Sequence, residues 1–77
     1  MIATVTDCIA CELRKLRAGK NLSIEELAQK STVSKDTISR YENNTVNMNI
    51  DILFKILCVY NVGFDIFFTN VYANKHK

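Results

Sequence analysis

The segment that most constrains the fold is residues 23–44, where two helix starts lie close together. Ser23 is followed three residues later by Glu26, the spacing of a capping box, in which each side chain accepts from a backbone amide at the helix start. Ser34 offers a second N-cap, and Asp36 lies where the positive end of a helix favours a negative charge. Ser31 and Thr32 interrupt the pattern between them. Two short helices joined by a tight turn are therefore predicted.

A first helix precedes this pair. Apolar residues recur at helical spacing at Ile9, Leu13 and Leu16, and Thr6 with Asp7 supplies N-cap chemistry. The helix is predicted over residues 7–18. Its stop signals are Gly19 and Asn21.

Two more helices follow the pair. Asn49 is an N-cap for the run IDILFKILCVY, and Asn61 tolerates the left-handed backbone that ends helices. Gly63 and FDIFF indicate a short fifth helix. The tail, residues 69–77, fits either a terminal strand or a disordered end. We therefore predict one all-α domain of five helices over residues 1–77, with its core over 7–68.

Composition excludes several classes of protein. The chain has 77 residues and a net charge of +2, and it carries neither a signal-peptide pattern nor an apolar run long enough to span a membrane. We expect a soluble cytoplasmic protein. The odd cysteine count argues against disulfides. Cys8 and Cys11 form a C-x-x-C, but Cys58 and His76 lack the paired spacing that would complete a zinc site. A redox motif is disfavoured because the C-x-x-C lies inside an amphipathic helical pattern and not at a strand-to-helix junction. No metal or cofactor is predicted.

The helix predicted over residues 34–42 has two different faces. Ile38, Tyr41 and Glu42 fall on one side, with Thr37 at the border. The other side carries Lys35, Asp36, Ser39, Arg40 and Asn43. An ordinary solvated face would look similar. However, a three-turn helix held across another by a tight turn has the shape that enters a B-DNA major groove.

The span LSIEELAQKSTVSKDTISRYENN resembles the lambda-repressor-like (Cro/repressor, Xre-type) helix-turn-helix family. The similarity extends over residues 9–68, and VGFDIFF is similar to the family's closing segment. The resemblance implies the five-helix fold of that family, with the helix-turn-helix at the second and third helices. It also implies a sequence-specific regulator of transcription, in particular a repressor, that binds double-stranded DNA through residues 34–42.

The resemblance assigns roles to individual residues. The base-contacting positions of the family correspond to Ser34, Lys35, Asp36, Ser39 and Arg40. Lysine and arginine donate to guanine O6 and N7, and aspartate accepts from the cytosine amino group. The expected phosphate contacts are Ser23, Thr37, Asn43, Asn44 and Thr45. For Thr37 and Thr45, a purely structural role at the helix border or helix end is an alternative.

Three residues depart from the family pattern. Ile24 stands where the family commonly has a glutamine that contacts the DNA backbone, which puts that contact in doubt. Ser31 and Thr32 replace leucine and glycine in the turn, and because a β-branched residue is poorly suited to positive φ, we expect this turn to differ in detail.

The resemblance also implies a partly buried structural ion pair between Arg17 and Glu42.

The fourth and fifth helices are unusually apolar. Residues 50–60 are hydrophobic nearly all round, and FDIFF adds further apolar area. A surface helix needs only one apolar stripe, and an exposed apolar patch usually marks an interface. We predict a homodimer, with possible strand pairing by the tail, that binds a pseudo-palindromic operator. The predicted interface residues are Ile52, Val59, Ile66 and Phe68.

A protein-interaction role and catalysis are the alternatives to DNA binding. The main alternative is a protein-interaction module, such as the antitoxin of a toxin pair or the partner of another regulator. An enzyme is disfavoured because the one histidine, His76, lies in a charged tail, no nucleophile has a visible base partner, and no glycine-rich phosphate loop occurs.

Overall fold

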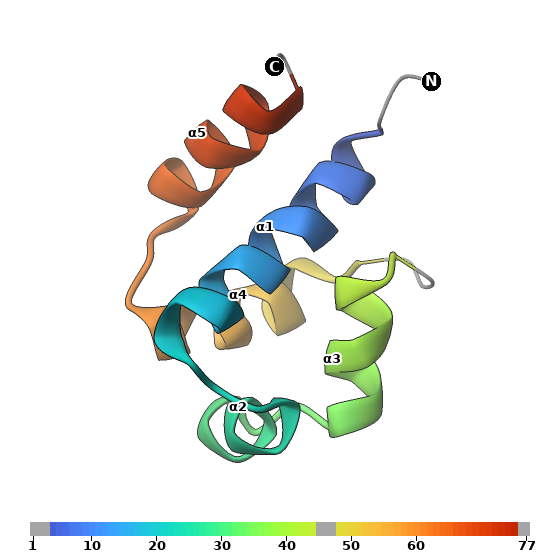
Figure 1. The fold of residues 1–77 in the computed structure, drawn as a ribbon, viewed down its shortest axis with the longest axis vertical. Coiled ribbons are helices and arrows are strands. Elements are labelled where there is room, and N and C mark those ends of the chain that lie inside the picture. Colours follow the sequence, from blue (N-terminus) through green and yellow to red (C-terminus); the bar gives the residue numbers. More distant parts are fainter. Residues whose placement is uncertain (1–3, 45–47, 76–77) are drawn as a thin grey trace.

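The computed structural model describes residues 4–44 and 48–75, with side chains described as far as Ala73. These residues form five helices and no strand (Figure 1). The helices are α1 (Val5–Lys20), α2 (Ile24–Ser31), α3 (Lys35–Glu42), α4 (Ile50–Tyr60) and α5 (Phe64–Lys75). The predicted all-α fold of five helices is confirmed.

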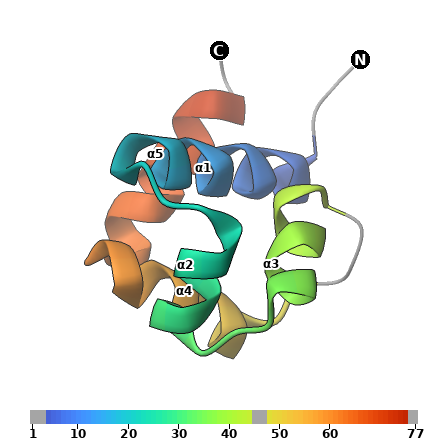
Figure 2. The ribbon, with the colours of Figure 1, turned by 60° about the horizontal axis from the view of Figure 1, so that its bottom comes forward.

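The helices pack around one core. α1 contacts α5 and α3, and α2 contacts α3 and α4. The start of α1 and the end of α5 lie at one end of the molecule and α2 at the other, while α3 stands beside α2 at the surface (Figures 1 and 2). The largest fully buried side chains come from four different helices, and each such burial stabilises the fold by about 1.5–3 kcal/mol. They are Leu27, Ile38, Leu57 and Phe67.

Side-chain caps set where the helices begin. Ser23 Oγ accepts from the Glu26 amide at 3.1 Å, and Glu26 Oε1 accepts from the Ser23 amide at 3.1 Å, so the predicted capping box of α2 is confirmed. α1 has a second capping box, between Thr4 and Asp7. The prediction that α1 begins at residue 7 was therefore wrong. Thr4 is the N-cap, so the helix begins at Val5 and Asp7 is its third residue.

Left-handed residues end three of the helices. Asn21 and Asn61 have φ values of 57° and 56°, so both are left-handed caps, whereas Gly19 lies inside α1. Thr32 has a φ of 61° and adopts the conformation that we expected a β-branched residue to avoid. Ser31 explains how the turn closes, because its buried hydroxyl donates to Leu27 O at 2.7 Å and accepts from the Val33 amide at 3.2 Å.

The fifth helix is longer than the sequence suggested. α5 extends to Lys75, so the interpretation of residues 69–75 as a strand or a disordered tail was wrong. Phe67 and Val71 lie four residues apart on the inner face, and both are buried against the rest of the core. Thr69 donates to Asp65 O at 2.7 Å on the outer side. Packing of this apolar stripe on α1 carries the helix through the polar residues between them.

None of the described helices is long and apolar enough to cross a membrane alone. Taken together, α4 and the part of α5 up to Ala73 have the length and composition for a span, but a bend of 97° separates them.

Candidate nucleic-acid interface

α3 presents the two faces that its sequence indicates. Ile38, Tyr41 and Glu42 are buried on the inner side, and the Tyr41 hydroxyl accepts from the Asn49 amide at 2.7 Å. The predicted base-contacting residues lie on the outer side. Ser34, Lys35, Asp36 and Arg40 are exposed, and Ser39 is half-buried. The structure therefore places four of the five on the accessible side of α3 and Ser34 at its N-cap.

Residues at the two ends of α3 serve the helix itself. Ser34 Oγ accepts from the Thr37 amide at 3.2 Å and lies 2.8 Å from Thr37 Oγ1. Asn43 donates from its side-chain amide to Ser39 O at 2.9 Å. Ser23 is likewise used as the N-cap of α2. Four of the predicted DNA contacts thus have structural roles in the free protein, and Thr45 lies outside the described residues.

Both cations of the exposed face have carboxylate partners. Arg40 Nε lies 3.2 Å from Asp36 Oδ2, one turn earlier on α3. Lys35 Nζ lies 3.8 Å from Glu25 Oε1, which belongs to the first turn of α2. Glu25 was not among the predicted residues, because its proximity to Lys35 depends on how α2 and α3 cross. Exposed pairs of this kind contribute only about 0–1 kcal/mol to stability.

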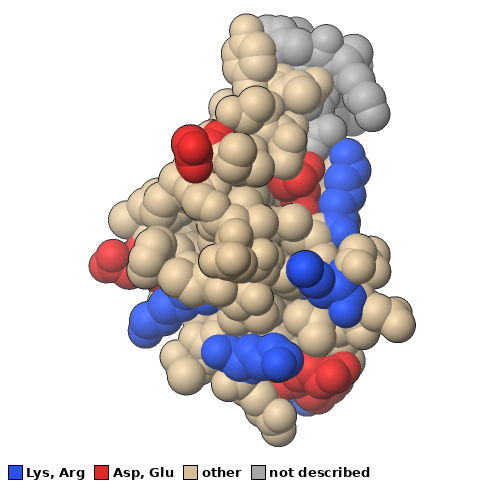
Figure 3. Space-filling view, turned by 90° about the vertical axis from the view of Figure 1, so that its left-hand side faces the viewer, with Lys and Arg blue, Asp and Glu red and all other residues tan. Residues whose placement is uncertain are grey.

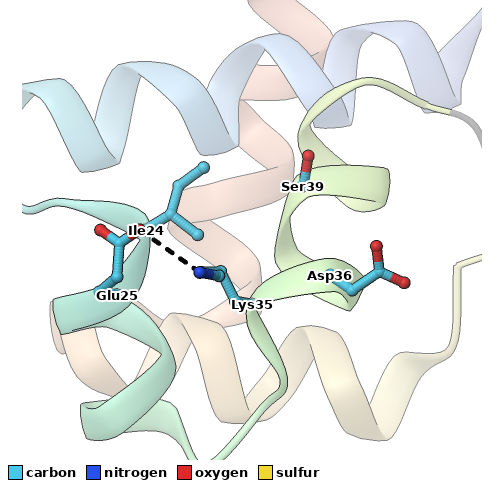
Figure 4. A pocket seen from close by; sticks show the side chains of 5 residues that line it. All are labelled: Ile24, Glu25, Lys35, Asp36 and Ser39. Carbon is cyan, nitrogen blue, oxygen red and sulfur yellow. Dashed lines mark ion pairs between the residues drawn. The ribbon is translucent and has the colours of Figure 1, made fainter.

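A hollow of about 330 Å³ separates the start of α2 from α3. Its lining comprises Ile24, Glu25, Lys35, Asp36 and Ser39. Figure 4 shows the Lys35 side chain directed across the hollow towards Glu25, with Ile24 as an apolar wall beside them and the Asp36 carboxylate pointing the other way. The hollow therefore opens beside the residues that are expected to read bases.

Arg17 of α1 binds Glu42, the last residue of α3, and so joins the C-terminal end of α3 to α1. Its Nε lies 2.9 Å and 3.2 Å from the two carboxylate oxygens of Glu42, and Nη2 lies 3.0 Å from Oε1. The remaining nitrogen, Nη1, donates to Leu22 O at 3.1 Å. The Glu42 side chain is only 6% exposed and that of Arg17 27%. The hydrogen bonds to Glu42 raise the pKa of Arg17 above its ordinary value.

Two further contacts join α1 to the end of α3. Arg14 donates to the backbone carbonyl of Glu42, a bond that the sequence analysis missed. The signal available was spacing, because Arg14 lies three residues before Arg17 on the same face of α1. Asn44 donates to Asp7 Oδ1 at 2.6 Å. The backbone amide of Thr4, and after it the Asn44 side chain, lowers the pKa of Asp7.

A second accessible surface is formed by the exposed large hydrophobic side chains of α4 and α5, which are Ile50, Phe54, Ile66, Phe68 and Tyr72. Its large apolar side chains range in exposure from 36% for Phe68 to 66% for Tyr72. Phe54, Phe64 and Phe68 form an aromatic row in which successive ring centroids lie 5.9 Å apart. Figure 3 shows the face on this side of the molecule as a broad uncharged area with charged groups towards its edges.

The predicted interface residues occupy two environments on this surface. Ile66 and Phe68 are exposed, whereas Ile52 and Val59 are half-buried against the core. Phe54 and Tyr72 were not among the predicted interface residues, although they are among the most exposed large hydrophobic side chains of the described residues. Helical periodicity alone does not distinguish which side of an all-apolar helix faces inwards.

The cysteines do not form a cluster. Cys8 is buried, Cys11 half-buried and Cys58 exposed, and all three are free thiols. Within residues 4–44 and 48–75, no group of three histidine, cysteine or acidic side chains is arranged to hold a metal ion.

Comparison with known proteins gives a family match and a structural match. A helix-turn-helix family model matches residues 13–67. A solved structure of a tyrosine-to-phenylalanine mutant of the restriction-modification controller protein C.Esp1396I superposes with a TM-score of 0.89 at 27% identity, covering 100% of this chain and 98% of that one. The wild-type controller structure gives a TM-score of 0.84 at 27% identity, covering 92% of each chain. No curated protein sequence matches.

Proposed function

Because the chain belongs to the Xre/lambda-repressor-like helix-turn-helix family of DNA-binding transcriptional regulators, we propose that it binds a pseudo-palindromic operator as a homodimer and represses transcription. The observation that carries this proposal is the arrangement of α3. One face is buried and fixed to α1 through Arg17 and Glu42, while the opposite face presents Lys35 and Arg40. A rigidly supported helix with exposed donors is what base reading in the major groove requires.

The proposed contacts divide into two classes. Lys35 and Arg40 donate to guanine O6 and N7, and Asp36 accepts from a cytosine amino group. Ser34 and Ser39 supply hydroxyls beside them. The phosphate contacts are assigned to Ser23, Thr37, Asn43, Asn44 and Thr45, which fix the register of the protein on the duplex.

The apolar surface of α4 and α5 supports the homodimer. Ile66, Phe68 and the neighbouring aromatic side chains are exposed in the single chain, and burying them against a second copy removes this area from water. We assign the interface to Ile52, Val59, Ile66 and Phe68. A two-fold axis at this surface would set two copies of α3 about 34 Å apart, one turn of DNA.

Repression is the proposed action on transcription. A dimer on an operator that overlaps a promoter excludes polymerase by occupying the same DNA. The structurally similar protein is described as a restriction-modification controller protein, which supports a regulatory role for this chain as well.

The test is selection of the purified protein against random duplex DNA near physiological salt, followed by sequencing of the bound pool. An enriched sequence with two inverted half-sites is expected. Sedimentation of the complex should show two chains per site, and a reporter placed behind that site should lose expression. A folded protein that enriches no sequence would contradict DNA reading and favour a protein-interaction module such as an antitoxin.

A further inference from the structure

We infer that Glu25 is a positioning residue for base reading: it directs Lys35 across the hollow between α2 and α3, and so raises the preference for the operator over other DNA. This inference rests on the proposed function. It extends that function to a residue of α2 that carries an acidic charge at the DNA-facing surface, where a carboxylate would otherwise only repel phosphates.

The geometry connects the two residues across the helix-turn-helix. Glu25 is the second residue of α2 and Lys35 the first of α3, and their charged atoms lie 3.8 Å apart at the rim of the hollow. Both side chains are well exposed, at 67% and 62%. The pair therefore contributes little to the stability of the fold, and its effect falls on where the ammonium group is held.

The chemistry of lysine makes the pair compatible with base reading. An ammonium group has three donors, so Lys35 can remain beside Glu25 while it donates to guanine O6 or N7. A lysine without this partner would turn as readily to the nearest phosphate, because its flexible stem carries a compact point charge. The carboxylate thus favours the geometry needed at a base edge.

Nonspecific DNA meets the same pair differently. There the affinity comes from neutralised phosphates, and a chain with a net charge of only +2 has few cations to offer. Glu25 offsets part of the charge of Lys35 and repels the backbone. Removing the carboxylate should therefore strengthen nonspecific binding and leave binding to the operator unchanged or weaker.

The experiment is a double-mutant cycle with Glu25→Gln and Lys35→Gln. Dissociation constants are measured for the selected operator and for a scrambled duplex, for wild type, both single variants and the double variant. For Glu25→Gln in the wild-type background, the ratio of the two constants should fall about three-fold, within the roughly 1.4- to 5-fold range of an exposed ion pair. In the Lys35→Gln background, Glu25→Gln should change both constants by the same factor.

Base preference provides a second readout. Selection against random DNA with Glu25→Gln should relax the base pair that Lys35→Gln relaxes, and not the one that Arg40→Ala relaxes. Asp65→Asn is the matched control, because it removes an exposed carboxylate from the same position of another helix, α5. It should leave the preference for the operator unchanged.

The outcomes separate the inference from the proposed function. If wild type selects no sequence, DNA reading itself fails. If wild type selects an operator, two results would overturn the role of Glu25: an equal change in both constants for Glu25→Gln, which indicates simple repulsion, or the same loss of preference with and without Lys35.

Discussion

The surface formed by α2 and α3 differs from that formed by α4 and α5 in the state of its side chains before a partner binds. On the first, Lys35 and Arg40 are exposed but already have carboxylate neighbours within 4 Å. On the second, Phe54 and Ile66 are exposed, and their side chains have no polar group to hydrate. Charged pairs at a surface are stable in water because they are solvated. Covering an apolar surface, by contrast, removes it from water and lowers the free energy. The first surface therefore suits exchangeable polar contacts, and the second suits a stable protein contact.

The largest expected effect is on the support behind the polar surface. Glu42→Ala leaves the Arg17 guanidinium without its carboxylate, and the free energy of unfolding should fall by about 3 kcal/mol, the lower end for a broken buried pair because Arg17 is partly exposed. Urea denaturation followed by circular dichroism measures this. Glu25→Gln, which breaks only an exposed pair, is the control and should stay within about 0.5 kcal/mol of wild type. An unchanged midpoint for Glu42→Ala would show that the pair does not support α3.

The next largest effect is expected on the apolar surface. Ile66→Glu places a charge in the proposed interface, so the dissociation constant of the dimer should rise by at least about 30-fold, equivalent to roughly 2 kcal/mol. Sedimentation across a concentration series measures it. Val5→Glu, an apolar-to-acidic change at a similarly exposed position on α1, is the control. Unaltered association of Ile66→Glu would place the interface elsewhere.

Arg40→Ala tests whether the two surfaces act separately. Loss of a base-edge donor should weaken binding to the selected operator by about 1–3 kcal/mol and relax one base pair. Dimerisation should not change. Lys55→Ala, which removes an exposed cation from α4, is the control for the loss of positive charge. An Arg40→Ala protein with the wild-type sequence preference would remove Arg40 from the base-reading set.

The smallest effect is expected in the core, at the buried Tyr60 at the end of α4. Burial, followed by the negative charge of Glu42, raises the pKa of Tyr60 to about 12, and the Tyr60 hydroxyl is buried without a hydrogen-bond partner among the described residues. A raised pKa means that the folded state holds this proton more tightly than the unfolded state does. Stability is therefore full below pH 10 and should fall by roughly 1–2 kcal/mol as the pH rises towards 12.

Tyr60→Phe isolates this contribution. The variant should lack that part of the pH dependence. At neutral pH it should be as stable as wild type, or more stable by up to about 1 kcal/mol, because no hydrogen bond is lost. Urea denaturation at pH 8 and pH 11 compares the two proteins. Parallel losses of stability in both would assign the alkaline transition to other groups.

How far the sequence could predict the molecule depended on the range of the interaction. The capping pair Ser23 and Glu26 is local, and it was found with the correct bounds for the start of α2. The length of α5 was missed because the polar residues after Phe68 hide a stripe that only packing on α1 reveals. Glu25 was missed because its relation to Lys35 arises from the crossing of two helices. The homodimer and the base contacts stay predictions.

The turn between α2 and α3 has a consequence for how the protein can evolve. With Thr32 in a left-handed conformation, the crossing of the two helices depends on the Ser31 hydroxyl, which bonds to both sides of the turn. A glycine at position 32 would adopt this conformation without steric cost. The tolerance of position 31 to substitution should then depend on which residue stands at 32. The order in which mutations arise would thus decide which sequences of this turn are accessible.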